Sequence, residues 1–340
     1  MNKLISILLV SVLLCLSACT AAPPVIGLTP SPTPQAAAAG PPAPPPTSKP
    51  DEFYTNYKNA ENRPLAVMID NDNSAAWPHS GLEDAYLLYE INVEGGATRI
   101  MALFNRTETQ KIGPVRSSRH YFLDYALEHD AVYTHYGWSP RAQSDIRSLG
   151  VNNINGLSDN YFWRETKYAG DYHSAFTSVE RINAAISDKR YRSERNGAPL
   201  NLSPHVYELN GEAADKVTIP FSGFYTVGFE YDDTAKTYKR FMNSREHPLQ
   251  NNAAIAAKNI IVIYMGESLL GDGSDRINIY NIASGKGYFF TGGKYIPITW
   301  SKPSRSDATS FKNEAGDEIK LNPGQTWIEI VPNNYTITIK

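Results

Sequence analysis

Arginine, hydroxyl and glycine residues are concentrated in one short segment of this 340-residue chain, Gly113-Pro114-Val115-Arg116-Ser117-Ser118-Arg119. This segment stands at the start of a stretch, residues 117–128, that we expect to be helical. The free amides and the dipole of a helix N-terminus favour an anion, and arginine binds carboxylate or phosphate through two parallel hydrogen bonds. The segment therefore predicts an anion site. The competing interpretation is that the two arginines pair internally with the carboxylate of Glu90 or Glu94.

Acidic side chains follow an apolar run that begins at Leu65 and ends at Ile69. Asp70 and Asp72 come directly after this run, and the end of a core strand is the usual place for a ligand in an open α/β sheet. The pair could bind a metal or transfer protons, whereas capping of the following loop is the competing interpretation. The spacing superficially resembles a calcium loop, but Ala75 and Gly81 stand where an EF-hand has Gly and Glu, so that motif is rejected. The sequence predicts no metal site and no cofactor.

His135 and Ser139 lie at a predicted turn from a strand into a helix. A serine at this place resembles the nucleophile elbow of hydrolases, but Gly137-Trp138-Ser139-Pro140 lacks the second glycine of that motif. Ser139 is better explained as a helix N-cap followed by proline at the first helical position. His135 titrates near neutral pH and could serve as a general base or a ligand, whereas a buried structural role is the competing interpretation.

Three tryptophans of the first half, Trp77, Trp138 and Trp163, together with many tyrosines, could stack on sugar rings. Core packing is the competing interpretation, because aromatic side chains bury a large area whatever the function. Nucleotide-binding and hydrolase motifs such as a Walker loop, Ser-x-x-Lys or His-Glu-x-x-His are absent from the sequence. The sequence motifs therefore do not identify an enzymatic reaction.

A mixed set of helices and strands must position these residues in the first half of the chain. Apolar runs predict strands, and Ser139 and a Thr177-x-x-Glu180 capping box predict helix starts. Arg99 alternates with apolar neighbours along one strand, so we expect a partly buried cation that needs a carboxylate. The predicted strands cover residues 65–69, 86–91, 98–104 and 131–136, and the predicted helices cover 117–128, 140–149 and a segment that starts at 177.

The second half of the chain is dominated by short strands separated by turns. We therefore predict an α+β protein, with a mixed α/β N-terminal domain over 53–215 followed by a β-rich C-terminal domain over 216–340. The strands predicted here cover 224–231, 237–241, 260–265, 276–282, 288–291, 295–300 and 327–331.

The N-terminus predicts a bacterial lipoprotein signal. An apolar run after Lys3 ends in Leu16-Ser17-Ala18-Cys19, and this run is too short to span a bilayer of ~30 Å hydrocarbon. We predict a signal peptide over 1–18 and acylation of Cys19 as the membrane anchor. Residues 19–52 are rich in Pro and Ala, so we interpret them as an extended tether. The predicted cellular location is the extracytoplasmic face of the cell membrane.

Composition excludes several classes of function. Cys15 belongs to the predicted signal and Cys19 to the predicted anchor, and the chain has only these 2 cysteines. The folded part therefore has no thiol for a nucleophile, a disulfide or a zinc site. A formal net charge of -3 produces no positive electrostatic potential that would attract the phosphates of a nucleic acid, so we expect no nucleic-acid partner.

A resemblance to a known family rests on six segments, which follow one another along this chain in the same order as in that family. They resemble the YerB-type lipoprotein family, which implies an α/β part followed by a β-rich part but supplies no reaction, since the family is of unknown function. After His173 the chain has Ser174 where the family pattern has Asn, and His247 is followed by Pro248-Leu249 where the pattern has a nearby acidic residue, so the resemblance does not carry a direct role over to either histidine. The segments are Arg63–Asn71, Tyr89–Arg99, Ile112–Arg119, Asp130–Ser139, Phe162–Arg164 and Asn322–Ile328.

These observations combine into one functional expectation. We expect a membrane-anchored lipoprotein that binds an anionic or sugar-containing ligand of the cell envelope, or an envelope protein. The alternative is a cell-wall hydrolase or transferase that uses acidic residues and His135. The candidate residues for one shared site are Asp70, Glu90, Glu94, Arg99, Arg116, Arg119, His135 and Arg164.

Overall fold

The fold is described from a computed structural model, which places residues 49–105, 107–196 and 200–340. The predicted signal peptide, Cys19 and the tether up to residue 48 lie outside these residues. Helix α1 (Glu52–Lys58) begins within the last residues of the segment predicted as tether. Its N-cap is Asp51, whose carboxylate accepts a hydrogen bond from the backbone amide of Phe53 at 2.8 Å. Residues 49–340 form one compact unit.

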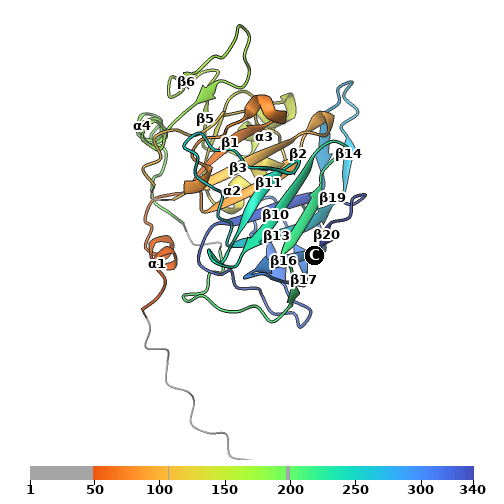
Figure 1. The fold of residues 1–340 in the computed structure, drawn as a ribbon. Coiled ribbons are helices and arrows are strands. Elements are labelled where there is room, and N and C mark those ends of the chain that lie inside the picture. The colour runs from red at the N-terminus through yellow and green to blue at the C-terminus, as the bar shows by residue number, and fades with distance from the viewer. Residues whose placement is uncertain (1–48, 106, 197–199) are drawn as a thin grey trace, which may run out of the picture. The chain divides into compact units, whose positions relative to one another are not determined.

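One large mixed sheet contains strands from both halves of the sequence (Figure 1). The late strand β19 lies between β13 and β2 and pairs in parallel with both. The regions 53–215 and 216–340 therefore contribute to a single sheet. Its strands, in spatial order, are β18 (Ser310–Lys312), β17 (Lys294–Ser301), β16 (Ser284–Thr291), β13 (Asn259–Met265), β19 (Thr326–Pro332), β2 (Leu87–Asn92), β3 (Thr98–Phe104), β1 (Leu65–Asn71), β4 (Val132–His135) and β5 (Asn153–Asn155), with β8 (Glu212–Ala213) paired to β17.

Among the described residues, a second sheet, two small ribbons and four α-helices accompany the large sheet. The predicted α+β class is confirmed, and the strands of the second half lie close to their predicted positions. The strands of the second sheet, in spatial order, are β12 (Arg245–Glu246), β11 (Thr237–Met242), β10 (Thr226–Asp232), β9 (Lys216–Pro220) and β20 (Thr338–Ile339). Two small ribbons pair β14 (Glu267–Leu269) with β15 (Ile277–Ile279) and β6 (Trp163–Arg164) with β7 (Ala175–Phe176). The remaining α-helices are α2 (Phe122–Glu128), α3 (Pro140–Ser148) and α4 (Val179–Asp188).

The central strands of the large sheet, β1, β2, β3 and β19, are buried on both faces. Successive side chains of a strand point to opposite faces, so Leu88 and Tyr89 of β2 enter two different apolar cores. On one face the second sheet covers β19, and the ring of Phe229 lies 6.3 Å from that of Trp327. On the other face α2 packs against β2, where Tyr125 stacks on Tyr89 at 4.5 Å. This burial on both faces explains why the strands read as continuous apolar runs.

Two helix starts differ from the sequence prediction. Helix α2 begins at Phe122, five residues later than expected, because the preceding segment pairs with its neighbours in extended form: Arg116 donates its amide to Met68 and Ser118 donates to Gly137. The predicted helix start next to Arg116 is therefore wrong, and a helix N-terminus does not supply the amides expected for an anion at this residue. Ser139 caps α3 as predicted, with its hydroxyl accepting from the Ala142 amide at 3.3 Å.

The cap of α4 is Ser178 and not the predicted Thr177. The Ser178 hydroxyl accepts a hydrogen bond from the Arg181 amide at 3.2 Å. The Thr177 hydroxyl instead donates to the carbonyl of Tyr161 at 2.9 Å, which ties the helix start to the preceding loop. Two adjacent hydroxyl residues offer two possible caps, and the tertiary contact of Thr177 decides between them.

Candidate functional site

Asp70, at the end of β1, is the centre of an ionic cluster that also contains Glu94, Arg99, Arg116, Arg119 and His173. The Asp70 side chain is fully buried. Its carboxylate accepts a hydrogen bond from His173 Nδ1 at 2.6 Å, lies 3.3 Å from Arg116 Nε, and accepts from the Asp72 amide at 3.2 Å. Burial opposes its ionisation, but His173, Arg116 and Arg99 together hold the pKa of Asp70 below its ordinary value. Asp70 therefore caps the loop as an ionised, paired carboxylate.

The other arginines of the ionic cluster are also satisfied by protein groups. Arg119 binds both carboxylate oxygens of Glu94, with its Nε at 2.8 Å from Oε2. Arg99 donates to the carbonyl of Ser117 at 2.6 Å and lies 3.9 Å from Glu94, so it has the carboxylate that its buried position requires. The predicted internal pairing with Glu94 is confirmed for Arg119 and wrong for Arg116, which pairs with Asp70.

Glu90 belongs to a neighbouring buried network that the second half of the chain completes. Its Oε1 accepts hydrogen bonds from Asn71, Thr98 and Tyr225 at 2.9, 2.6 and 2.9 Å. Arg240 of β11 pairs with Oε2, and both side chains are fully inaccessible. Because Asn71 directly follows Asp70, the buried network and the ionic cluster meet at the end of β1. A buried pair of this kind needs such additional hydrogen bonds to compensate for desolvation.

Two histidines extend the buried network in a fixed direction. Arg240 Nη1, which can only donate, lies 2.6 Å from His247 Nδ1, so that nitrogen carries no hydrogen. His247 Nε2–H therefore donates to His79 Nδ1 at 2.7 Å, and His79 Nε2–H donates to the backbone carbonyl of Asp70 at 2.7 Å. Burial lowers the pKa of His79 to about 4 and that of His247 well below its ordinary value. Both rings are thus neutral hydrogen-bond connectors.

Glu329 faces Glu90 across the parallel pair of β19 and β2. Its side chain is fully buried, and its Oε1 lies 3.9 Å from Arg240 Nε. Burial and the charge of Glu90 raise the pKa of Glu329 well above its ordinary value. Burial and Glu90 therefore favour the uncharged form of Glu329, beside the charged pair of Arg240 and Glu90.

A cavity of about 520 Å³, which we call the aromatic pocket, lies beside both groups of residues. Tyr225 and Asn71 connect it to the buried network, and Glu94 connects it to the ionic cluster. The Trp77 indole donates to Asn71 at 3.3 Å, and Phe224 is 66% exposed. Aromatic faces with a few polar groups are characteristic of small-molecule sites. The lining residues are Asn71, Asp72, Trp77, Glu94, Gly95, Ala97, Phe224, Tyr225, Met242, Asn243 and Arg245.

The structure does not bring His135 into the shared site. His135 is fully buried, and its two ring nitrogens bond the carbonyl of Gly137 at 2.8 Å and the side chain of Asn153 at 3.1 Å. Burial lowers the pKa of His135 to about 4, so it is neutral at physiological pH. Trp138 packs on this ring at 5.5 Å. The interpretation of His135 as a structural core residue agrees with this geometry, because neither nitrogen is left for a substrate.

Arg164 also has a local role. Its guanidinium donates to the Ser174 hydroxyl at 2.8 Å and lies 4.6 Å from the centre of the Tyr136 ring. It therefore supports the loop that carries His173 and does not reach Asp70 directly. Trp163 is covered by Arg181 at 5.0 Å, so Trp77 is the predicted sugar-stacking tryptophan that lines the pocket.

Sequence reasoning missed the residues that complete the site from a distance. His173 was not among the candidate residues, yet it forms the 2.6 Å bond to Asp70. His247, which was also not a candidate, lies between Arg240 and His79. No local signal identifies His247, because it follows the polar residues Arg245 and Glu246 and precedes Pro248. In residues 49–105, 107–196 and 200–340, no group of His, Cys, Asp and Glu side chains is arranged to hold a metal ion.

Fold and site together define a class of two-part α+β proteins in which both parts build one sheet and one buried charge network. Two family models match the chain: "Protein of unknown function (DUF3048) N-terminal domain" over residues 52–192 and its C-terminal counterpart over 217–328. The chain belongs to this family.

Two relatives are the same Bacillus protein, seen as a sequence and as a structure. The chain is 30% identical to "Putative lipoprotein YerB" of Bacillus subtilis (strain 168) over 284 residues, which is 82% of this chain and 84% of that protein. The crystal structure of YerB from Bacillus subtilis superposes with a TM-score of 0.74 at 28% identity and covers 83% of this chain and 95% of that chain. The resemblance to the YerB-type family is confirmed. In the described part of the chain, no helix has the length and apolar character needed to cross a membrane.

Proposed function

We propose that this chain is a lipoprotein, anchored through Cys19 at the extracytoplasmic face of the cell membrane, that binds a sugar-containing ligand of the cell envelope in the aromatic pocket. The observation that carries the ligand class is the lining of this cavity of about 520 Å³, where Trp77, Phe224 and Tyr225 stand beside Asp72 and Asn243. A sugar ring presents apolar C–H faces to aromatic rings and hydroxyls to carboxylates and amides.

The contacts of the arginines favour a sugar over a simple anion. Arg119 is bound by Glu94 on both oxygens, and Arg116 lies 3.3 Å from Asp70. Binding of a phosphate or carboxylate at Arg119 would have to displace the Glu94 carboxylate, which already holds two nitrogens of that guanidinium. The pocket wall itself carries the carboxylates of Asp72 and Glu94, which accept hydrogen bonds from hydroxyl groups.

The anchor rests on the sequence of the N-terminus and on the relative. The segment Leu16-Ser17-Ala18-Cys19 fits a lipoprotein cleavage site, and the Bacillus relative bears the description of a lipoprotein. The proline-rich segment after Cys19 is the proposed tether between the anchor and the folded residues.

The ligand class is tested by binding of the full chain, in detergent, to purified cell-wall glycan fragments. Trp77→Ala and Phe224→Ala should each weaken binding about fivefold, because the loss of one aromatic face costs about 1 kcal/mol. Tyr280→Ala, at an exposed aromatic residue outside the pocket, is the matched control and should bind as the wild type does. Equal binding by all three variants, with unchanged circular dichroism, would refute the pocket as the sugar site.

The anchor is tested separately by replacing the acylation point. Cys19→Ala should move the protein from the membrane fraction to the soluble fraction or leave it as uncleaved precursor, since no other thiol remains after the signal. Metabolic labelling with a fatty acid reports the modification directly. Incorporation of label into the Cys19→Ala variant would contradict the proposed anchor.

A further inference from the structure

Arg245, the first residue of β12, lines the aromatic pocket. It pairs with Met242 of β11, and side chains that stand opposite each other in a strand pair lie on the same face of the sheet. Met242 is fully buried and also lines the pocket. The Arg245 side chain therefore lies on the face of the second sheet that forms the pocket wall, and the next residue, Glu246, is directed to the other face.

The backbone on both sides of Arg245 is held in place. Asn243, in the preceding turn, accepts a hydrogen bond from the Thr226 amide at 2.8 Å and donates one to the Phe224 carbonyl at 3.0 Å. Two residues after Arg245, His247 is buried and hydrogen-bonded within the buried network. The backbone positions of Arg245 and Phe224 are therefore fixed relative to each other, although both side chains are exposed.

The ring of Phe224 contacts the loop between β2 and β3, which forms another wall of the pocket. A Cβ atom on Gly96 would lie 2.9 Å from Phe224 Cζ, so the ring packs directly on this glycine. Trp77 lines the same cavity from the segment after β1. The pocket therefore offers aromatic surface for the apolar face of a sugar ring and, at Arg245, a guanidinium for one substituent of that ring.

The charge of Arg245 is available to a ligand. Its guanidinium makes no hydrogen bond or ion pair with the part of the chain that the structure describes. Of the two carboxylates that line the pocket, Glu94 is bound on both oxygens by Arg119, and Asp72 also interacts with protein groups. Water solvates the exposed guanidinium of Arg245, so a ligand can bind it without displacing a protein carboxylate.

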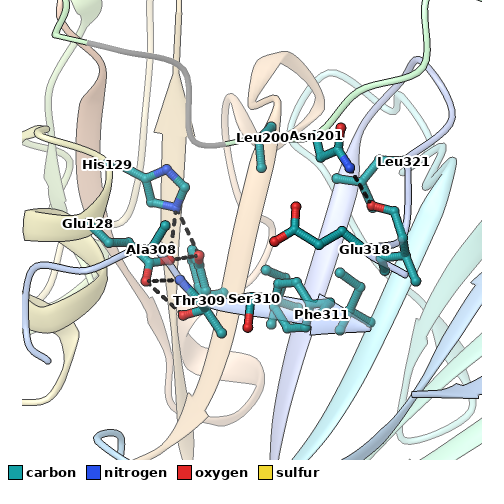
Figure 2. A pocket seen from close by; sticks show the side chains of 14 residues that line it. Glu128, His129, Leu200, Asn201, Ala308, Thr309, Ser310, Phe311, Glu318 and Leu321 are labelled. Atoms are coloured by element: carbon teal, nitrogen blue, oxygen red, sulfur yellow. Dashed lines mark hydrogen bonds and ion pairs between the residues drawn. The ribbon is translucent and has the colours of Figure 1, made fainter. Parts of the chain in front are cut away.

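The pairing of Glu94 agrees with that of the buried carboxylate in another cavity of the fold, of about 180 Å³ (Figure 2). There, Glu128 accepts hydrogen bonds from Lys302 Nζ at 2.6 Å and from the Thr309 hydroxyl at 2.7 Å. Both carboxylates are thus compensated within the protein. Arg245 differs from them, because the compensating charge has to come from outside the described residues.

We infer that the sugar bound in the aromatic pocket is a sugar acid and that Arg245 binds its carboxylate. This inference rests on the proposed sugar site and adds the charge of the ligand. A guanidinium donates two parallel hydrogen bonds to a carboxylate, which fixes the orientation of the sugar as well as its charge. A phosphate monoester, with a charge of about −1.5 to −2 at pH 7, fits less well, because it would be repelled more strongly by the nearby carboxylates of Asp72 and Glu94.

The test uses the full chain in detergent and peptide-free cell-wall glycan strands, whose N-acetylmuramic acid units carry a carboxylate. The comparison ligand is the same glycan after conversion of these carboxylates into methylamides, which removes the charge at similar size. By titration calorimetry we expect the acidic glycan to bind about tenfold more tightly than the amidated one, the effect of one charge-assisted hydrogen bond. Higher salt should reduce this difference, because salt screens an exposed ion pair.

Arg245→Gln should remove the difference between the two glycans. Arg245→Lys should restore part of it, because lysine keeps the charge but not the two parallel donors. The matched control is Arg141→Gln, which removes an exposed arginine of α3 that lies outside the pocket. This control should keep the full preference for the acidic glycan.

The inference is overturned if the wild type binds both glycans equally. It is also overturned if Arg245→Gln keeps the preference with an unchanged circular dichroism spectrum, or if Arg141→Gln loses as much of it as Arg245→Gln. Trp77→Ala separates these failures from a failure of the sugar site. Equal binding of both glycans that Trp77→Ala weakens refutes the acidic group alone, whereas binding of neither glycan by the wild type refutes the sugar site as well.

Discussion

Glu90 and Arg240 form a charged pair whose desolvation must be compensated by other contacts, because both side chains are fully buried. The two residues lie 150 positions apart in the chain. The pair is held by Asn71, Thr98 and Tyr225, which satisfy Oε1 of the carboxylate. Tyr225 and Asn71 also line the aromatic pocket. The charged pair therefore fixes two polar groups of the proposed sugar site.

At the residue scale we predict that Arg240→Met destabilises the protein by about 3–5 kcal/mol, because it leaves the carboxylate of Glu90 buried without its cation. Arg116→Met is the matched comparison. The Arg116 side chain is 25% exposed and Asp70 keeps its bond to His173, so we expect a loss of about 1 kcal/mol or less. Urea unfolding measures both values. Equal losses for the two variants would show that burial does not distinguish these arginines.

The bond between Asp70 and His173 connects two elements that are distant in the chain. Asp70 ends β1, and His173 stands in the loop before β7, which is also held by Arg164 and Asp171. The same loop places Tyr172 at 5.8 Å from the Arg116 guanidinium. One ion pair therefore attaches the loop to the edge of the ionic cluster.

At the element scale we predict a pH dependence that is specific to this attachment. The hydrogen bond with Asp70 raises the pKa of His173 above its ordinary value. The stabilisation is therefore complete below the unfolded-state pKa of about 6.5 and is lost as the pH rises through the higher folded-state pKa. The free energy of unfolding should fall over this alkaline window in the wild type and stay flatter in His173→Gln. Parallel pH profiles for the two proteins would contradict this assignment.

The single large sheet determines how the whole molecule unfolds. Strand β19, close to the C-terminus, forms parallel ladders with β2 of the first half and β13 of the second. The buried network crosses the same boundary through Glu90 and Arg240. Neither half can lose its structure without exposing the apolar strand and the buried charge of the other.

At the scale of the whole molecule we predict one cooperative unfolding transition for residues 49–340. Three of the 5 tryptophans, at 77, 138 and 163, report on the first half, and Trp300 and Trp327 report on the second. Phenylalanine variants that keep only one of these two groups should give the same urea midpoint by fluorescence, and both should coincide with circular dichroism. Two separated midpoints would show that the halves unfold independently.

The sequence alone determined the local structure of this protein. The apolar runs at 65–69 and 98–104 identified β1 and β3, and the Ser139-Pro140 pair marked the start of α3. These features are readable because strand patterning and helix capping depend on residues within a few positions of one another. The need of Arg99 for a carboxylate was also readable, since a cation among apolar neighbours requires a partner.

Only the tertiary structure decided which residues meet. The insertion of β19 beside β2 brings Glu329 opposite Glu90, and the packing of the second sheet brings Arg240 to the same point. His173 reaches Asp70 across 103 residues of chain. No local pattern encodes such pairings, because they depend on strand order and on register between distant segments, which the packing of the whole core sets. The sequence therefore supplied most of the charged groups of the ionic cluster, and the fold selected their partners and excluded His135.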